Sequence, residues 1–382
     1  MKSVFLSSAE ASGDHYMAEI AKALRANGFD HELWGMGSAE SRAAGIDVLW
    51  PGEHLQLFGL TEVFSSIPRI LRLLKEAAQT VVRRNPDAVV VVDSPDYHLR
   101  LLAKLRKYGY GGPVFYISPP TVWAWRSGRV KYLRRYVTEC FPLYGFEHEN
   151  FPAHGCNSYW DGAPLLEEFV KRGETEIPDE FAGNDKIVAF MPGSRRSEVT
   201  KLIPVMEQIA CNLEKCGWQP VFSVAPGLNP SVREQLIKTL DEKKLRHFDG
   251  QGRELLKAAQ CSVSASGTIT VESLLLDRYM VSIYKMGVIS GVIANMIVKP
   301  GLPRGCFSMT NIIANEEIFP EFFQNKCTPE AVTASVLAWL DGSAEFRGAV
   351  SEKLALTRAK LGRTGVYDRW AKHILERITC LN

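Results

Sequence analysis

Short runs of consecutive apolar residues alternate along the chain with longer segments in which apolar residues recur every three to four positions. In the first half, the strand-like segments are residues 3–7, 31–34, 88–92, 113–117 and 137–142, of which 88–92 is entirely apolar. Continuous Val- and Ile-rich runs are typical of strands buried on both faces, and helix-length segments between them indicate parallel connections. The first half is therefore predicted to form a parallel α/β sheet with helices on both faces.

The same alternation restarts after a polar segment, residues 178–185, which contains Pro and Gly. The later strand-like segments are residues 186–191, 220–224, 261–265 and 280–284. We therefore predict two doubly wound parallel-sheet (Rossmann-like) domains, residues 1–170 and 171–360, with a linker near 165–185.

Polar clusters rich in small residues follow five of these predicted strands. They occupy residues 8–14, 93–96, 118–126, 192–198 and 264–270. Open α/β sheets bind ligands at the carboxyl ends of their strands. Two such sheets facing each other across a cleft would collect these clusters into one ligand site.

The first cluster contains Glu10, Ser12 and Gly13. Gly13 allows the backbone to turn closely, and Ser12 or Asp14 can cap the following helix, which is predicted over about residues 16–27. The cluster therefore fits either a capped loop or a sugar site in which Glu10 supplies a carboxylate.

Asp93 ends a fully apolar run and Asp96 lies three residues later. A carboxylate at the end of a buried strand can act as a general base, so Asp93 is the candidate for that role. Asp96 comes directly before the next predicted helix and is better placed to cap it. His98 is expected inside that helix rather than in catalysis.

Trp123, Trp125 and Arg126 follow the predicted strand at 113–117. Their aromatic rings can stack on a sugar, pack against an acyl chain, or belong to the core between the sheet and the next helix. The sequence leaves these alternatives open.

The cluster at 192–198 contains Ser194, Arg195 and Glu198. Small residues let backbone N–H groups point at an oxyanion, a helix start near Glu198 adds its positive end, and arginine binds phosphate in a bidentate manner. The pattern matches neither the Walker motif nor the dinucleotide fingerprint. Phosphate binding is favoured over a plain turn into a capped helix.

Ser266, Gly267 and Thr268 form a second small-residue loop that leads into a helix, and Glu272 lies one turn inside it. The loop suits a pyrophosphate and Glu272 suits a pair of ribose hydroxyls, although Ser266 or Thr268 can also be a simple helix cap. Two such loops in one domain favour a nucleotide diphosphate whose charge is neutralised without a metal ion.

Residues 64–82 combine apolar positions, among them Ile70, Leu71 and Leu74, with interleaved Arg69, Arg72 and Lys75. This pattern fits a helix that faces the core with a charged outer side, and it also fits a basic amphipathic helix in a membrane interface.

Composition narrows the class of protein. The net charge of +2 argues against nucleic-acid binding. We see no signal peptide and no apolar stretch of transmembrane length, and the eight cysteines form no Cys-x-x-Cys pair. We therefore expect a cytoplasmic protein with reduced thiols and no metal or other cofactor.

When these motifs are considered together, the chain resembles the lipid-A-disaccharide synthase family over nearly its whole length. The motifs that carry the resemblance are Glu10 to Asp14, Asp93 to Asp96, Val122 to Arg126, Pro192 to Arg195 with Glu198, Ser266 to Thr268 with Glu272, and Asn311 with Pro320 to Gln324. The chain departs from the family pattern at Ala9, Ala163 and Thr310, and by one extra residue within 118–122. These departures concern the acceptor more than the class of reaction.

The resemblance implies a GT-B fold and an inverting transfer of 2,3-diacylglucosamine from UDP-2,3-diacylglucosamine to 2,3-diacylglucosamine 1-phosphate. It implies that Asp93 is the base, with Glu10 as the alternative, and that helices from about 360–382 return to the first domain. It also implies peripheral attachment to the inner face of the cytoplasmic membrane; we expect a monomer or homodimer.

The residues expected on the nucleotide-sugar side are Ser194, Arg195, Glu198, Ser266, Gly267, Thr268, Glu272, Asn311 and Gln324. Those expected on the acceptor and lipid side are Ser12, Gly13, Asp96, Trp123, Trp125, Arg126, Ile70, Leu71 and Leu74.

Two other classes of function share these features. One is another GT-B UDP-sugar transferase or a UDP-sugar 2-epimerase, which would have the same sheets and pyrophosphate loops. The other is a non-catalytic protein that binds nucleotide sugars or lipids, against which the presence of both Asp93 and Arg195 argues.

Overall fold

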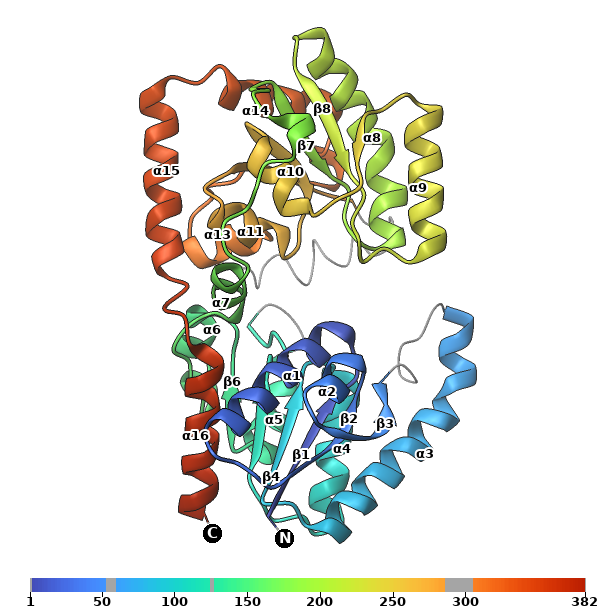
Figure 1. The fold of residues 1–382 in the computed structure, drawn as a ribbon, viewed down its shortest axis with the longest axis vertical. Helices are drawn as coiled ribbons and strands as arrows, with labels where there is room; N and C mark the ends of the chain where they lie inside the picture. The colour runs from blue at the N-terminus through green and yellow to red at the C-terminus, as the bar shows by residue number, and fades with distance from the viewer. Residues whose placement is uncertain (1, 53–59, 124–126, 286–304, 382) are drawn as a thin grey trace. The chain divides into compact units, whose positions relative to one another are not determined.

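The computed structural model describes residues 2–52, 60–123, 127–285 and 305–381, and side chains within these ranges except at 11, 12, 60–67 and 381. The chain forms two compact units (Figure 1). The first comprises Met1–Glu167 and Gly362–Asn382, and the second comprises Glu168–Leu361. Each unit contains a six-stranded sheet in which every pairing is parallel, which confirms the predicted fold class.

The sheet of the first unit has the order β3-β2-β1-β4-β5-β6. Its strands are β1 (Ser3–Ser8), β2 (Glu32–Gly37), β3 (Asp47–Pro51), β4 (Ala88–Val92), β5 (Val114–Ile117) and β6 (Glu139–Phe141). The chain first moves outward from β1 to β3 and then crosses back to β4 on the other side of β1. The carboxyl ends of β1 and β4 therefore flank the switch point of the sheet, where open α/β sheets bind their ligands.

Helices cover both faces of this sheet. They are α1 (Ala11–Ala26), α2 (Ala39–Ala43), α3 (Leu60–Arg84), α4 (Pro95–Lys107), α5 (Val130–Tyr136), α6 (Gly145–Asn150), α7 (Pro164–Lys171), which runs into the second unit, and α16 (Val366–Leu381). Side chains alternate along β1, so that Val4 and Leu6 join one core cluster and Phe5 joins the other. The first cluster contains residues of α1 and α16, and the second contains residues of α3, α4 and α5.

The second unit repeats this plan with the order β12-β11-β10-β7-β8-β9. Its strands are β7 (Ile187–Met191), β8 (Gln219–Ser223), β9 (His247–Phe248), β10 (Cys261–Ala265), β11 (Tyr279–Tyr284) and β12 (Glu321–Phe323). Its helices are α8 (Arg196–Lys215), α9 (Pro230–Glu242), α10 (Gly252–Ala258), α11 (Ile269–Leu275), α13 (Met309–Ala314), α14 (Pro329–Leu340) and α15 (Ala344–Ala359). Short 3₁₀ turns lie at Ser127–Arg129, Pro152–His154, Asp179–Phe181 and Gln324–Lys326. Here the switch point lies between β7 and β10.

Two details differ from the sequence-based prediction. Strands β3, β9 and β12 were not predicted, and all three are edge strands with mostly half-exposed side chains, so they lack the continuous apolar run of a central strand. Helix α1 begins at Ala11 rather than near residue 16, because Gly13 lies within its first turn instead of in a loop.

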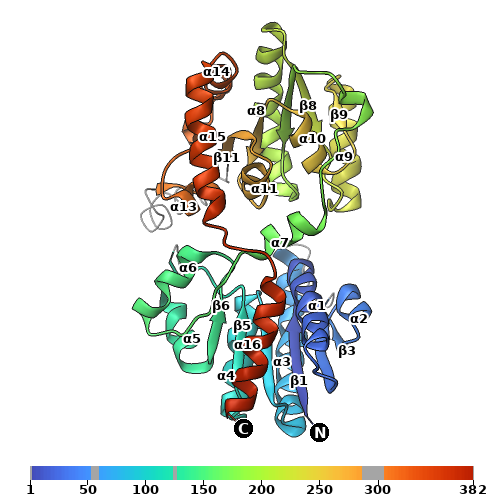
Figure 2. The same ribbon diagram turned by 60° about the vertical axis from the view of Figure 1, so that its left-hand side comes forward.

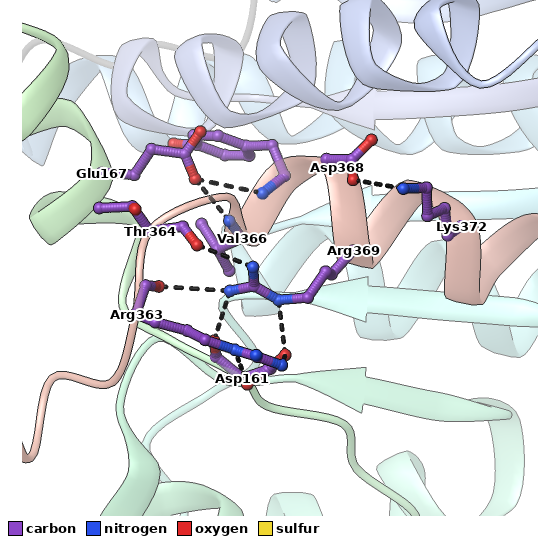
Figure 3. Close-up of polar contacts among 9 residues, drawn as sticks. Asp161, Glu167, Arg363, Thr364, Val366, Asp368, Arg369 and Lys372 are labelled. Atoms are coloured by element: carbon purple, nitrogen blue, oxygen red, sulfur yellow. Dashed lines mark hydrogen bonds and ion pairs between the residues drawn. The ribbon is translucent and has the colours of Figure 1, made fainter.

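The last helix, α16, belongs to the first unit although it follows the second unit in sequence. It packs beside α1 (Figure 2) and buries Trp370, Ile374 and Ile378 in the core. The backbone N–H groups of Val366 and Tyr367 at its start donate to Oε2 of the buried Glu167, at 2.6 and 3.4 Å (Figure 3). Glu167 therefore caps this helix from a distant part of the chain.

Asp161 provides a second link to the segment that leads into α16. Its carboxylate accepts hydrogen bonds from Nε and Nη2 of Arg363, at 3.0 and 2.6 Å, and also pairs with Arg369 (Figure 3). These charge-assisted contacts fix the chain where it returns to the first unit.

Within the described residues, no helix combines the length and apolar character needed to cross a membrane. The eight cysteines are all free thiols.

We predict that Glu167→Ala weakens the attachment of α16, because two helix N–H groups lose their buried acceptor. The free energy of local opening should fall by about 1–2 kcal/mol, the usual value of a helix cap. Native-state hydrogen exchange of the α16 amides measures it. Glu376→Ala, which removes an exposed carboxylate of the same helix, is the matched control and should leave exchange unchanged. Equal exchange in both variants would contradict the capping role.

Candidate active site

In the first unit, Asp93 follows β4 at the switch point of the sheet and its side chain is half-buried. Glu10 follows β1, the neighbouring strand, and is exposed. Ser94 links the two segments, since its Oγ donates to Glu10 Oε1 at 3.3 Å. The structure therefore places the two predicted catalytic carboxylates close together.

The environment of Asp93 favours proton uptake. Burial raises the pKa of this carboxyl above its ordinary value, and the negative charge of Glu10 raises it further, while a hydrogen bond from the Ser94 backbone opposes both. A carboxylate with a raised pKa is a stronger base than an ordinary aspartate. The pair is therefore suited to accept a proton from a hydroxyl group.

Gly13 is required by close packing. A Cβ at this position would lie 2.6 Å from Ser8 Oγ and 3.4 Å from the Val92 carbonyl oxygen, so any side chain would push α1 away from the ends of β1 and β4. Ser12 lies in the first turn of α1, and its side chain is outside the described residues. The structure thus assigns Gly13 a steric role at this sheet edge.

Asp14, in the same turn, is a structural residue. It is buried, and its carboxylate accepts hydrogen bonds from the backbone of Ser38 and Glu40 and from the Ser41 hydroxyl. It therefore holds the start of α2 rather than capping its own helix.

Asp96 is exposed and forms an ion pair with Arg129, 2.5 Å from Nη2 to Oδ1. Ser94 occupies the N-cap position of α4 but makes no capping hydrogen bond with its side chain, and Asp96 lies inside the first turn of the helix, so the cap role predicted for Asp96 was wrong. Its carboxylate is instead held toward α5.

Trp123 is held by a buried acid. Its indole Nε1 donates to Glu147 Oε1 at 3.0 Å, and its ring meets Phe146 edge-on at 5.0 Å. Oε2 of Glu147 accepts the backbone N–H groups of Leu143 and Tyr144, and burial raises the pKa of Glu147 to about 7. The Trp123 ring is therefore fixed. Trp125 and Arg126 lie outside the described residues.

The three residues of α3 that were predicted to contact lipid differ in their burial. Leu74 is fully buried in the core, so its predicted role in lipid contact was wrong. Ile70 is partly buried against the same core, and Leu71 is 46% exposed. The inward spacing of Ile70, Leu74 and Val81 is that of a core-facing helix, and among the side chains that the structure describes on α3, Leu71 is an exposed apolar group that can meet a membrane.

In the second unit, the loop after β7 is built around Glu198. This buried carboxylate accepts the Arg195 backbone N–H at 3.3 Å and its Nη1 at 2.9 Å. Gly193 adopts φ +97°, where a Cβ would lie 2.4 Å from Glu198 Oε2. Glu198 therefore shapes the loop, while Ser194 and the Arg195 side chain, which is 76% exposed, are accessible from solvent.

The loop after β10 presents Gly267 and Thr268, both exposed, at the start of α11. No described atom lies within 4 Å of the position of a Cβ on Gly267, so there is space above the loop. Ser266 Oγ donates to the Phe307 carbonyl at 3.1 Å. Glu272 is partly buried, and burial raises the pKa of its carboxyl against the opposing effect of Arg172 and Arg253.

Asn311 is fully buried and its amide is committed to protein groups. Nδ2 donates to the Phe319 carbonyl and to Glu321 Oε1, and Oδ1 accepts the backbone N–H groups of Ile318 and Phe319. A side chain so placed acts on a ligand only through the segment it holds, which leads through β12 to Gln324. Gln324 itself has φ +51°, directly after β12.

Sequence reasoning missed two groups in this unit. Glu321 accepts the backbone N–H groups of Phe307 and Ser308, both at 2.8 Å, and so ties β12 to the start of α13. Tyr284, Phe307 and Phe323 form a cluster of rings with centroids 5.8–6.2 Å apart. These contacts join segments that are distant in sequence; the only local sign was the position of Tyr284 at the end of a predicted strand.

The two units offer complementary chemistry. The first brings Glu10, Asp93 and Ser94 together, which can accept a proton. The second presents Arg195 and two loops at helix starts, which can bind an anion. Among the described residues, no three His, Cys, Asp or Glu side chains gather in a metal-binding arrangement.

The family match and the relatives of known function identify the same family. Residues 4–364 match the family described as lipid-A-disaccharide synthetase. The lipid-A-disaccharide synthase of Myxococcus xanthus is 33% identical over 375 residues, which cover 96% of this chain and 95% of that protein. The lipid-A-disaccharide synthase of Alcanivorax borkumensis is 33% identical over 380 residues, covering 94% and 97%.

Solved structures share the fold at low sequence identity. The UDP-GlcNAc 2-epimerase of Neisseria meningitidis, bound to UDP-GlcNAc, aligns with a TM-score of 0.62 at 14% identity over the whole of both chains. The calicheamicin glycosyltransferase CalG4 aligns with a TM-score of 0.58 at 11% identity, covering 100% of this chain and 99% of that one. At these identities the likeness establishes the fold alone.

We predict that Gly193→Ala weakens UDP binding about tenfold or more, because the added Cβ displaces Glu198 from the loop and strains a left-handed backbone. Gly183→Ala is the matched control, since it adds the same strain at φ +72° where a Cβ meets nothing within 4 Å. Titration calorimetry with UDP measures the difference. Unchanged binding in Gly193→Ala would remove this loop from the nucleotide site.

Proposed function

Because the chain belongs to the lipid-A-disaccharide synthase family, and is thus a glycosyltransferase of lipid A biosynthesis, we propose specific substrates for it. The donor is UDP-2,3-diacylglucosamine and the acceptor is 2,3-diacylglucosamine 1-phosphate. The observation that carries the proposal is the family match over residues 4–364, which includes the Asp93 segment and both anion-binding loops.

In the proposed reaction, Asp93 accepts the proton of the acceptor 6-hydroxyl as that oxygen attacks C1 of the donor sugar. The new bond forms between this oxygen and C1, and the bond between C1 and the β-phosphate oxygen breaks, so that UDP leaves with the bonding electrons. Attack from the side opposite UDP inverts C1 and gives the β-1,6-linked disaccharide 1-phosphate. The raised pKa of Asp93 and its place at the sheet switch point support it as the base.

On the donor side, we assign ligand contacts to the more exposed residues and loop-holding roles to the buried ones. Arg195, Ser194 and the N–H groups of the loop at Gly267 bind the pyrophosphate and neutralise the charge of the leaving UDP, so that no metal is required. Glu272 binds the ribose hydroxyls, and Gln324 lies on the sugar side. Glu198 and Asn311 act by holding these loops, since both are buried and bonded to protein groups.

The family match favours this proposal over the two alternatives. A UDP-sugar 2-epimerase shares the fold, but that likeness stands at 14% identity, against 33% over nearly the whole chain for the synthases. A protein that only binds its ligand has no use for a base of raised pKa.

For location, we propose peripheral attachment to the inner face of the cytoplasmic membrane, where both acylated substrates are anchored. Leu71 on α3 is exposed and is flanked by the exposed Arg69 and Arg72, an arrangement suited to the interface of an anionic bilayer.

We predict that the purified protein in detergent releases UDP from UDP-2,3-diacylglucosamine only when 2,3-diacylglucosamine 1-phosphate is present, with a disaccharide 1-phosphate detected by mass spectrometry. Asp93→Asn should lower turnover about a hundredfold or more, because the base is lost. Asp30→Asn, on an exposed loop, is the matched control. The same rate in excess EDTA is expected if no metal takes part.

The same assay distinguishes the two carboxylates by pH. The rate should fall as pH drops through the pKa of Asp93, and Glu10→Gln should move this fall to lower pH, because one cause of the raised pKa is removed. Loss of turnover in Glu10→Gln with activity kept in Asp93→Asn would make Glu10 the base. UDP-sugar consumption without acceptor would indicate an epimerase or hydrolase instead.

We predict that Leu71→Ser lowers binding to vesicles containing phosphatidylglycerol about five- to tenfold, because an exposed leucine no longer enters the interface. Leu356→Ser is the matched control, since Leu356 is 64% exposed on α15. Vesicle co-sedimentation measures the difference. An equal response of the two variants would contradict a membrane role for α3.

A further inference from the structure

The backbone after β4 adopts a conformation that its residues do not favour. Asp93 and Ser94 have φ +53° and +45°, two successive non-glycine residues in the left-handed region. A non-glycine residue in this region has an unfavourable backbone energy, so contacts around it must hold the turn in place.

Two buried donors hold this turn through one atom, the carbonyl oxygen of Asp93. The hydroxyl of Tyr116, on β5, donates to it at 2.8 Å, and Nδ1 of His98, on α4, lies 2.7 Å away. Both side chains have no exposed surface. The Asp93 N–H donates to the Ile117 carbonyl at 3.0 Å, so both sides of the residue are fixed.

The contacts of His98 determine its tautomer. A carbonyl oxygen only accepts hydrogen bonds, so Nδ1 must carry the proton. Burial lowers the pKa of His98 to about 4, so the ring is neutral at physiological pH and Nε2 is an acceptor. Ser7 Oγ lies 3.0 Å from Nε2 and donates to it, which links the end of β1 to the Asp93 turn.

We propose that His98 is a positioning residue for the reaction: together with Tyr116, it fixes the peptide of Asp93 and thereby the direction of the catalytic carboxylate. The proposal rests on the proposed function of Asp93 as the base. His98 lies behind the turn, fully buried, and acts through the Asp93 carbonyl rather than on the substrate.

Substitution of His98 by asparagine or by glutamine tests the contributions of its two ring nitrogens one at a time. The side-chain amide of asparagine places its nitrogen near the position of Nδ1, so His98→Asn keeps the donor to Asp93. The longer glutamine reaches the position of Nε2, so His98→Gln keeps the contact with Ser7 and loses the donor. We expect His98→Asn to keep kcat within about threefold, and His98→Gln to lower kcat about ten- to a hundredfold with the donor KM unchanged.

Tyr116→Phe provides a second variant that removes the other donor to the same oxygen. It should lower kcat in the same way while circular dichroism and thermal unfolding show a folded protein. If His98→Gln fails to fold, this variant carries the test alone, and wild-type kcat in Tyr116→Phe would overturn the proposal.

A double variant separates positioning from general structural damage. In the Asp93→Asn background, adding His98→Gln should leave the residual kcat unchanged, because the carboxylate that His98 positions is already absent. A further fall of about tenfold would show a structural role and overturn the proposal. If Asp93→Asn alone keeps full activity, the base assignment fails and the proposal fails with it. If Asp93→Asn is inactive while His98→Gln is fully active, only the positioning role is lost.

Discussion

In a parallel sheet, the carboxyl ends of all strands lie on one side and the amino ends lie on the other. Both sheets of this protein are parallel throughout, and both cross back at their first strand, so β1 with β4 and β7 with β10 create a switch point in each unit. The segments after these four strands carry Glu10, Asp93, Arg195 and the loop at Gly267. The proton-accepting and anion-binding groups thus occupy these positions as a consequence of strand direction and strand order.

Buried and half-buried carboxylates hold the loops at the ends of these strands in shape. Asp14, Glu147, Glu198 and Glu321 each accept one or more backbone N–H groups from an adjoining loop or helix start. An N–H group bound in this way is no longer available to a ligand, so these acids also decide which groups remain free. These acids therefore shape the loops, while residues such as Arg195 remain exposed.

The central strand at 88–92 was predictable because burial on both faces leaves a continuous apolar run, and its predicted bounds, like those of 261–265, are the same in the structure. The edge strands β3, β9 and β12 were not, since partial exposure removes that run. Asp93 was identifiable from its position after a strand, whereas the roles of His98 and Tyr116 depend on contacts between α4, β5 and the turn. Leu74 and Asn311 were misjudged for a related reason: residue type does not reveal which side of a helix faces the core, or whether an amide is already bonded.

The return of α16 to the first unit has a consequence for how the protein is made. The core of that unit includes Trp370, Ile374 and Ile378, which the ribosome adds only after the entire second unit. Until residues 366–381 are made, the first unit therefore lacks the side chains with which α16 completes this core beside α1, while the second unit can fold as soon as it emerges. A nascent chain halted before residue 366 would be expected to need chaperone protection at that incomplete core.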